Sequence, residues 1–505
     1  MKKLILLLCA CLSFVSKAVT FDVDGLRYEI LSQEDQTVEL AIKPKSISYP
    51  TYSTYSGDIT IPSEVVFNGR AYKVVAIGNH AFSNCYSLGE ISIPQSVESI
   101  GFGSFSYSNI SEIVLPGNLK SIGAAAFRDS DIKEIIIPES VKEIESTVFA
   151  NCRNLQKVQI LTNQIDGIPD NTFDSCSSLK EVNIPSSVKY LGRHAFALTR
   201  SLERLEIPSS CTEIGSYCFY YSGLTYIEIP DGVTELKGEM FANCSNLEVV
   251  DLPQTLSNFD KKAFYGCSKL KAINIPNGIT EISSECFSYC ISLSEVVFPN
   301  TLKRINSKAF LNCSSLKRIC IPEGTTLVDS EAFYGCYISE LSLPSTLQKV
   351  GGWAFGISEL QELILPEALT EIGSYAFDDC VIRKVLCMSL IPINCEENVF
   401  NNDTYIYGTL NVPEGCLALY KEAKPWNSFF NIVEYENSSI ENVMQGNCDY
   451  IIDGNKIIFD DNCHITVYDM KGNQIGYSVS GCFIFPQKGI YIICIPNIKP
   501  FKVCI

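Results

Sequence analysis

The chain has 505 residues, of which 46% are hydrophobic, and its 57 acidic residues outnumber its 39 basic residues to give a net charge of −18. A nucleic-acid partner would require a basic stripe, so this balance argues against nucleic acid as the ligand. Only three histidines occur, His80, His194 and His464, which is a poor supply for acid–base chemistry or for a metal site.

The N-terminus has the pattern of an export signal. Two lysines precede an apolar run from Leu4 to Val15, and Ser16-Lys17-Ala18 offers small residues at the cleavage position. We therefore expect residues 1–18 to be a signal peptide that is cleaved near Ala18. The mature protein would then be secreted or displayed on the outer surface of a bacterium.

The same segment contains Cys11, which would allow a lipoprotein, although the apolar residues that follow it are unlike the start of a mature chain. The apolar run is too short to span a bilayer, and no later segment reaches 18 apolar residues. We expect no transmembrane segment.

Residues 19–75 predict short β-strands joined in hairpins. The strands are expected at residues 21–31, 37–42, 58–61 and 71–77, with Asp24-Gly25 and Asn68-Gly69 as turn pairs. Such a β cap would cover the first of the repeats that follow it.

Phenylalanine recurs at a nearly constant interval of 22 to 24 residues through most of the chain, and this period is typical of a solenoid. Repeats of this size cannot bury a core alone, so each must stack on its neighbours. The period predicts about 15 coils over residues 76–405. The ladder positions are Phe82, Phe105, Phe127, Phe149, Phe173, Phe196, Phe219, Phe241, Phe264, Phe287, Phe310, Phe333, Phe355, Phe377 and Phe400.

Each repeat also contains a segment in which apolar and polar residues alternate, such as Glu181-Val182-Asn183-Ile184, and a proline then ends it. Alternation is typical of a strand, and stacked strands of this kind would form a parallel sheet. The positions that follow the proline are too short for a long helix, and predict turns, a short strand or a single 3₁₀ turn. One repeat departs from the pattern, because the longer turn Leu161–Pro169 replaces the strand proline.

Nine of the 23 cysteines lie three residues after a ladder phenylalanine, at a position where other repeats have serine or threonine. A disulfide framework would require paired cysteines, so this alternation favours buried free thiols that behave as small hydrophobic side chains. The nine are Cys85, Cys152, Cys176, Cys244, Cys267, Cys290, Cys313, Cys336 and Cys380.

The repeat resembles the BspA-like leucine-rich repeats of bacterial surface proteins, with the signature Ile-Gly-x-x-Ala-Phe-x-x-Cys-x-x-Leu. The segments 77–85 and 372–380 match it closely, and the resemblance covers about residues 60 to 400. It implies a mainly β leucine-rich-repeat solenoid. It also implies adhesion to host matrix proteins or to other bacteria.

Residues 406–436 are expected to cap the far end of the array. Residues 416–424 predict a short helix, and Trp426, Phe429 and Phe430 would cover the last coil. Residues 437–444 form a polar linker. An open solenoid needs such caps because its ends would otherwise expose sheet edges and apolar side chains.

Residues 445–505 lack the repeat and predict seven short strands, which indicate a small β-sandwich. The segment 465–475, followed by Gly489-Ile490-Tyr491 and a terminal Lys502-Val503-Cys504-Ile505, resembles the type IX secretion sorting domain of Bacteroidetes. This resemblance implies export across the outer membrane. A small unrelated β domain is the alternative.

No catalytic, cofactor or metal motif stands out in the sequence. We expect a protein that is not an enzyme and that uses no cofactor. The solvent-facing side of the strands is the expected docking surface, because its middle combines aromatic, apolar and charged residues. The candidate residues are Arg204, Glu206, Tyr226, Glu228, Val249, Asp251 and Asn274.

The sequence thus predicts a secreted or cell-surface solenoid that binds an extracellular protein or glycan. The alternative is a passive coat or spacer protein, whose exposed carboxylates only keep the strand face soluble.

Overall fold

The computed structural model describes residues 19–46 and 49–435, and the strand segments 450–453, 456–459, 465–469, 474–478, 482–484, 490–495 and 498–504. The expected signal peptide and the expected linker lie outside the described residues. The chain divides into two compact units, unit 1 (residues 1–165) and unit 2 (residues 166–505). Their boundary falls within Leu161–Pro169, where the repeat pattern departs.

Unit 1 begins with the two predicted hairpins, and both turn at the predicted pairs. Strand β1 (Thr20–Val23) pairs antiparallel with β2 (Leu26–Ser32) around Asp24-Gly25, and β7 (Glu64–Phe67) with β8 (Arg70–Ile77) around Asn68-Gly69. Both residues of each turn have positive φ, as a tight hairpin requires.

The cap is joined to the first coil by parallel pairing. Strand β3 (Thr37–Leu40) pairs with β8, and β6 (Gly57–Thr60) pairs with β9 (Leu88–Ser92). Strands β4 (Pro44–Ser46) and β5 (Tyr49–Ser53) form a separate hairpin. The coils of unit 1 then contribute β10 (Ser99–Ile100), β11 (Ser121–Ile122), β12 (Glu134–Ile137), β13 (Glu143–Ile144) and β14 (Lys157–Ile160).

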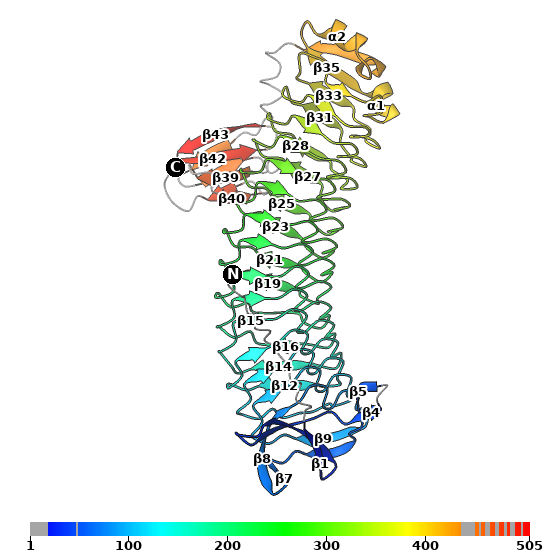
Figure 1. Cartoon of the computed structure of the whole chain (residues 1–505). Helices are drawn as coiled ribbons and strands as arrows, with labels where there is room; N and C mark the ends of the chain where they lie inside the picture. Colours follow the sequence, from blue (N-terminus) through cyan, green and yellow to red (C-terminus); the bar gives the residue numbers. More distant parts are fainter. Residues whose placement is uncertain are drawn as a thin grey trace, which may run out of the picture. The chain divides into compact units, whose positions relative to one another are not determined.

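Most coils of unit 2 contribute two strands, and each strand stacks in parallel on its counterpart in a neighbouring coil (Figure 1). The strands before the proline form the first sheet, and the strands after the proline form the second sheet. The first-sheet strands are β16 (Glu181–Val182), β19 (Tyr226–Glu228), β21 (Val249–Asp251), β23 (Ala272–Asn274), β25 (Glu295–Val297), β27 (Arg318–Cys320), β29 (Glu340–Ser342), β31 (Glu362–Leu365) and β33 (Lys384–Cys387). The second-sheet strands are β15 (Gly167–Ile168), β17 (Tyr190–Leu191), β18 (Glu213–Ile214), β20 (Glu235–Leu236), β22 (Asn258–Phe259), β24 (Glu281–Ile282), β26 (Arg304–Ile305), β28 (Leu327–Val328), β30 (Lys349–Val350), β32 (Glu371–Ile372) and β34 (Asn394–Cys395).

The first sheet follows the alternation of the sequence. In β12, Ile135 and Ile137 are buried while Glu134 and Ile136 are exposed, because successive side chains point to opposite faces. The two-residue strands after each proline form a second parallel sheet, which runs through six strands from β24 to β34. Residues 112–114 and 204–206 occupy first-sheet positions without forming strands.

The ladder phenylalanines fill the interior, as predicted. All fifteen are at most 3% exposed. Within unit 2 consecutive rings stack almost parallel; for example, the centroids of Phe264 and Phe287 are 5.3 Å apart and those of Phe310 and Phe333 are 5.1 Å apart. Burial of each ring is worth roughly 1.5–3 kcal/mol.

The turns around each ladder phenylalanine share an unusual backbone. The residues two before and two after the ring both have φ near +60° in almost every coil, for example Lys308 and Asn312 around Phe310. Successive N–H groups of the turn alternate between two kinds of acceptor. Lys308 N–H donates to Ser330 O in the next coil, and Ala309 N–H donates to Asn306 O in the same coil. The left-handed residues thus allow the turns to stack without losing backbone hydrogen bonds.

The cysteine column is buried, as predicted. All nine cysteines are free thiols that are at most 2% exposed. Among the cysteines between residues 85 and 416, only Cys320, on the outer face of β27, is exposed.

The last coils end in a compact cap that contains α1 (Asn402–Tyr407), β35 (Thr409–Pro413), α2 (Leu417–Glu422), the 3₁₀ turn η1 (Trp426–Ser428) and β36 (Asn431–Tyr435). Trp426 is fully buried, and its indole N–H donates to the carbonyl of Ile393 (3.0 Å). Phe429 is 4% exposed, but Phe430 is 89% exposed. The prediction that Phe430 covers the last coil is therefore wrong, because adjacent residues in extended chain point to opposite sides.

The C-terminal segment forms two antiparallel sheets, at the positions where strands were predicted. One contains β37 (Tyr450–Asp453), β38 (Lys456–Phe459) and β41 (Cys482–Ile484). The other contains β39 (Ile465–Asp469), β40 (Gln474–Ser478), β42 (Ile490–Ile495) and β43 (Ile498–Cys504). Ile465, Val467 and Ile493 are buried.

Candidate binding surface

The seven candidate residues lie on four successive coils of unit 2 and face solvent. The parallel register places Tyr226 beside Val249 and Glu228 beside Asp251. Arg204 and Glu206 belong to the preceding coil, which is linked by a hydrogen bond from Thr225 N–H to the carbonyl of Glu203 (3.0 Å). Asn274 ends β23, in the coil that follows β21.

The side chains of this surface form an acidic patch around one aromatic ring. Tyr226 Oη donates to the carboxylate of Asp251 (2.7 Å), and this hydrogen bond raises the pKa of the tyrosine. Val249 is 47% exposed. Glu206, Glu228 and Asp251 are exposed, and within the described part of the chain none of them forms an ion pair. We call the seven residues the acidic strand patch.

Further along the first sheet of unit 2, two carboxylates are paired with basic side chains. Arg318 Nε donates to Glu340 (2.9 Å) across neighbouring strands, and Lys384 lies 4.0 Å from Glu362. Exposed pairs of this kind contribute little to stability, but they leave no net charge for a partner to recognise. The three carboxylates of the acidic strand patch therefore differ from Glu340 and Glu362, which are neutralised by basic neighbours.

The remaining chemistry of the described residues is sparse. His80 and His194 are half-buried, and burial lowers the pKa of both imidazoles. Over the ranges that the structure describes, no group of three or more His, Cys, Asp or Glu residues could hold a metal ion. His464 lies outside the described residues.

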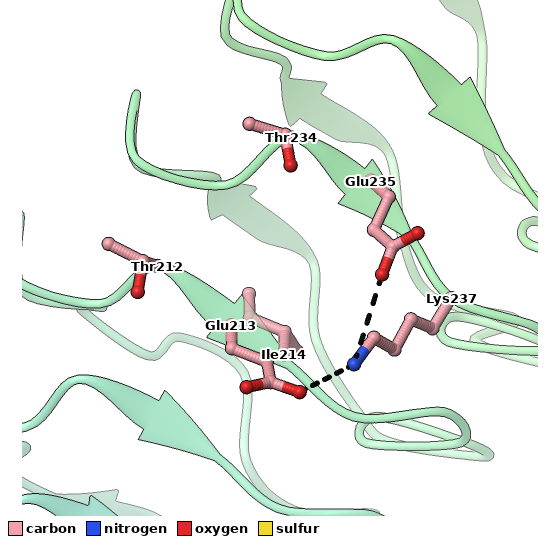
Figure 2. A pocket seen from close by; sticks show the side chains of 6 residues that line it. All are labelled: Thr212, Glu213, Ile214, Thr234, Glu235 and Lys237. Carbon is pink, nitrogen blue, oxygen red and sulfur yellow. Dashed lines mark hydrogen bonds and ion pairs between the residues drawn. The ribbon is translucent and has the colours of Figure 1, made fainter.

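Figure 2 shows a shallow hollow on the second sheet, which the sequence does not indicate. Thr212 and Thr234 line it together with an ionic group in which Lys237 Nζ lies 2.6 Å from Glu213 and 3.9 Å from Glu235. The ammonium group lies between the two carboxylates and neutralises one of their two negative charges. The hollow therefore offers a ligand threonine hydroxyls and one net negative charge.

The sequence interpretation missed a second group of exposed side chains, on the turns of unit 2. Five tyrosines gather there, one or two residues away from the ladder phenylalanines: Tyr217, Tyr220, Tyr221, Tyr265 and Tyr289. We call them the tyrosine cluster. The sequence does contain a signal for this group, because tyrosine recurs one or two residues from the ladder phenylalanines.

Comparison with known proteins agrees with the fold. The sequence model for the BspA type leucine rich repeat region matches residues 75–199, 166–294 and 280–407. No curated protein matches. Among the described residues, no helix is long and apolar enough to cross a membrane.

Three solved structures are similar to this chain to different degrees. A leucine-rich repeat protein from Bacteroides ovatus is 29% identical over 71% of this chain and 94% of its own, with a TM-score of 0.58. A leucine rich cell surface protein from Faecalibacterium prausnitzii is 24% identical over 70% of this chain and 94% of its own, with a TM-score of 0.42. The pneumococcal vaccine antigen PcpA is 18% identical over 83% of this chain and 99% of its own, also with a TM-score of 0.42.

The family matches cover most of the repeat array, and the coils have the stacked parallel strands that such repeats form. This chain therefore belongs to the BspA-type leucine-rich repeat family.

Proposed function

We propose that this chain is an exported bacterial surface protein that binds an extracellular protein or glycan, in the manner of an adhesin, through the acidic strand patch. The observation that supports this most is the charge of the patch. Glu206, Glu228 and Asp251 lie on three successive coils around an exposed valine and a tyrosine, without an ion pair to neutralise them. Such a surface complements a partner that presents basic groups, and tyrosine is a favoured anchor at interfaces.

The proposal is tested by capture of a panel of extracellular-matrix proteins, extracellular glycans and whole cells by immobilised protein starting at Val19. The double variant Glu206→Lys, Glu228→Lys should weaken capture about tenfold or more and should reverse its dependence on salt. Glu90→Lys is the control, because Glu90 is an exposed glutamate on β9 in unit 1, outside the acidic strand patch.

The outcomes separate the two functions considered. Equal capture by the double variant and the wild type would place the binding site elsewhere. Failure of the wild type to capture any member of the panel would favour the alternative of a passive coat or spacer protein.

We further propose that residues 1–18 direct export and that the C-terminal domain directs passage across the outer membrane. The basic and apolar pattern of the N-terminus and the strand pattern of residues 445–505 support this. Deletion of residues 445–505 should leave the protein in the periplasm, which cell fractionation measures. Normal surface display of the truncated chain would contradict a sorting role.

A further inference from the structure

The turns of unit 2 carry aromatic side chains that the core does not need. The ladder phenylalanines Phe219, Phe264 and Phe287 are fully buried and complete the interior of their coils. The tyrosine cluster lies outside this ladder, and Tyr221 and Tyr289 are 40% and 41% exposed. These rings therefore remain in contact with water.

The five rings form two groups of contacting side chains. Within one coil, the ring centroids of Tyr217 and Tyr220 are 5.7 Å apart and those of Tyr220 and Tyr221 are 4.6 Å apart, in edge-to-face geometry. Tyr265 and Tyr289, from two later coils, have centroids 5.4 Å apart. One coil separates the two groups.

The coil between Tyr221 and Tyr265 has small side chains where the coils on either side have aromatic ones. Its residues at the corresponding places are Ala242, which is 1% exposed, and Asn243. Backbone hydrogen bonds run from Tyr221 N–H to Ala242 O and from Asn243 N–H to Tyr265 O, so the three coils are stacked directly. Ala242 and Asn243 thus interrupt the row of aromatic side chains between Tyr221 and Tyr265. Their smaller side chains leave the surface lower there than at the rings.

The backbone gives no reason for aromatic residues at these places. Tyr217, Tyr221 and Tyr289 have φ of +60°, +53° and +63°, a region that favours glycine or asparagine. Neighbouring coils have Gly266 and Asn312 at the position equivalent to Tyr221 and Tyr289. Almost every coil has this backbone at both positions, so the turn itself does not require tyrosine there.

Polar groups border the rings. Tyr217 Oη donates to Glu239 (3.1 Å), and the guanidinium of Arg193 lies 5.5 Å from the centre of the Tyr217 ring. Lys262 lies 5.5 Å from the centre of the Tyr265 ring and 3.5 Å from Glu285. The surface therefore combines ring faces with hydroxyl, amide and paired charged groups.

We propose that the tyrosine cluster is a carbohydrate-binding site that takes a glycan chain along the stack of coils. Sugar rings have apolar C–H faces that pack on aromatic rings and hydroxyl edges that pair with such polar groups. The spacing of coils, about 4.8 Å, is close to the length of one sugar residue in an extended chain. A protein partner is a poorer fit, because stable protein interfaces bury about 800 Å² per partner and this row is narrow and bordered by ion pairs.

A second aromatic group on the same turns would extend the site. Trp353 and Tyr375 stack with centroids 4.4 Å apart, and Trp353 also meets Tyr334 edge-to-face at 5.7 Å. Trp353 and Tyr375 share the turn position of Tyr217, and Tyr334 shares that of Tyr220. Aromatic residues thus recur along the turns of unit 2.

The test is a glycan microarray of host and microbial glycans probed with the protein starting at Val19, followed by titration of the best glycan. The double variant Tyr221→Ala, Tyr289→Ala should lose at least tenfold in affinity, whereas Tyr221→Phe, Tyr289→Phe should keep most of it because the rings remain. Tyr86→Ala is the matched control, since Tyr86 is a 61% exposed tyrosine in unit 1. Urea unfolding of each variant shows that the fold is kept.

The proposal is overturned if the wild type binds no glycan on the array, or if the double alanine variant binds as well as the wild type. If the double alanine variant loses capture of a protein and the array shows no glycan signal, the partner of the tyrosine cluster is a protein and not a carbohydrate. The double variant Glu206→Lys, Glu228→Lys should bind glycan normally, so failure of the acidic strand patch and failure of the tyrosine cluster are distinguishable.

Discussion

The thiol of Cys313 lies 3.1 Å from the carbonyl oxygen of Phe287, which belongs to the preceding coil. Cys244, Cys290 and Cys336 reach the phenylalanine carbonyl of the preceding coil in the same way, at 2.9, 3.2 and 3.0 Å. Two serines of this column differ: Ser108 and Ser358 donate to the phenylalanine carbonyl of their own coil, both at 2.7 Å. The longer cysteine side chain thus links successive coils.

We predict that the buried thiols are inert in the native protein. Burial raises the pKa of Cys152, Cys244 and Cys380 to about 12, because the thiolate is poorly solvated there. At pH 8 only about one such thiol in ten thousand would be ionised, and the thiolate is the reactive form. Labelling with a maleimide, followed by peptide mass spectrometry, should modify these residues only after unfolding.

Cys320 is the comparison residue for this labelling, because it is exposed on β27; its pKa is also raised by desolvation, so the contrast rests on accessibility to the reagent. It should be modified in the native state, and Cys320→Ser should remove that signal. Rapid native labelling of Cys244 or Cys380 would contradict the buried column.

The phenylalanine ladder predicts a large loss of stability on truncation. Phe264 is fully buried, and its centroid lies 5.3 Å from those of both Phe241 and Phe287. Phe264→Ala should cost about 3–5 kcal/mol, because it removes apolar area and leaves a cavity. Urea unfolding followed by circular dichroism measures this. The control Tyr86→Ala should cost less than about 0.5 kcal/mol. Similar losses of stability in the two variants would contradict the placement of the ladder in the interior.

The two aromatic residues of the far cap should differ in the same assay. Trp426→Ala should cost about 3–5 kcal/mol, because the indole is fully buried and donates to Ile393. Phe430→Ala should change the unfolding free energy by less than about 0.5 kcal/mol, since that ring is 89% exposed. A strong effect of Phe430→Ala would show that another part of the protein covers this side chain.

Unit 1 should lose stability as the pH rises toward neutral, through one carboxyl group. Glu39 in β3 lies directly opposite Glu29 in β2. Burial, and secondarily the charge of Glu29, raise the pKa of Glu39 from 4.5 to about 7. The folded state therefore binds more protons than the unfolded state between pH 4.5 and 7, and stability falls as the pH rises through this window.

Glu39→Gln removes this charge and should stabilise unit 1 by about 1–2 kcal/mol at pH 8, after allowance for solvent screening, with little effect at pH 4.5. Urea midpoints of the wild type and the variant at both pH values measure it, with the exposed Glu90→Gln as control. Equal gains at both pH values would point to a cause other than titration.

How far the sequence determines this protein differs between its parts. The period fixes which residues occupy equivalent positions, so the buried phenylalanines, the buried cysteines and the solvent-facing strand residues could all be assigned from spacing. Turn pairs such as Asn68-Gly69 fixed the hairpins of the cap, because few residues adopt positive φ at low cost.

The period could not show which contacts equivalent residues make with neighbouring coils. That Cys313 bonds to the preceding coil while Ser108 bonds to its own depends on side-chain length in three dimensions. The period also could not distinguish Phe429 from Phe430, because the cap does not repeat. Alternation alone does not show which of two adjacent residues faces the interior. The tyrosine cluster likewise includes residues from different turns, and only the stacking of the coils brings Tyr265 and Tyr289 into contact.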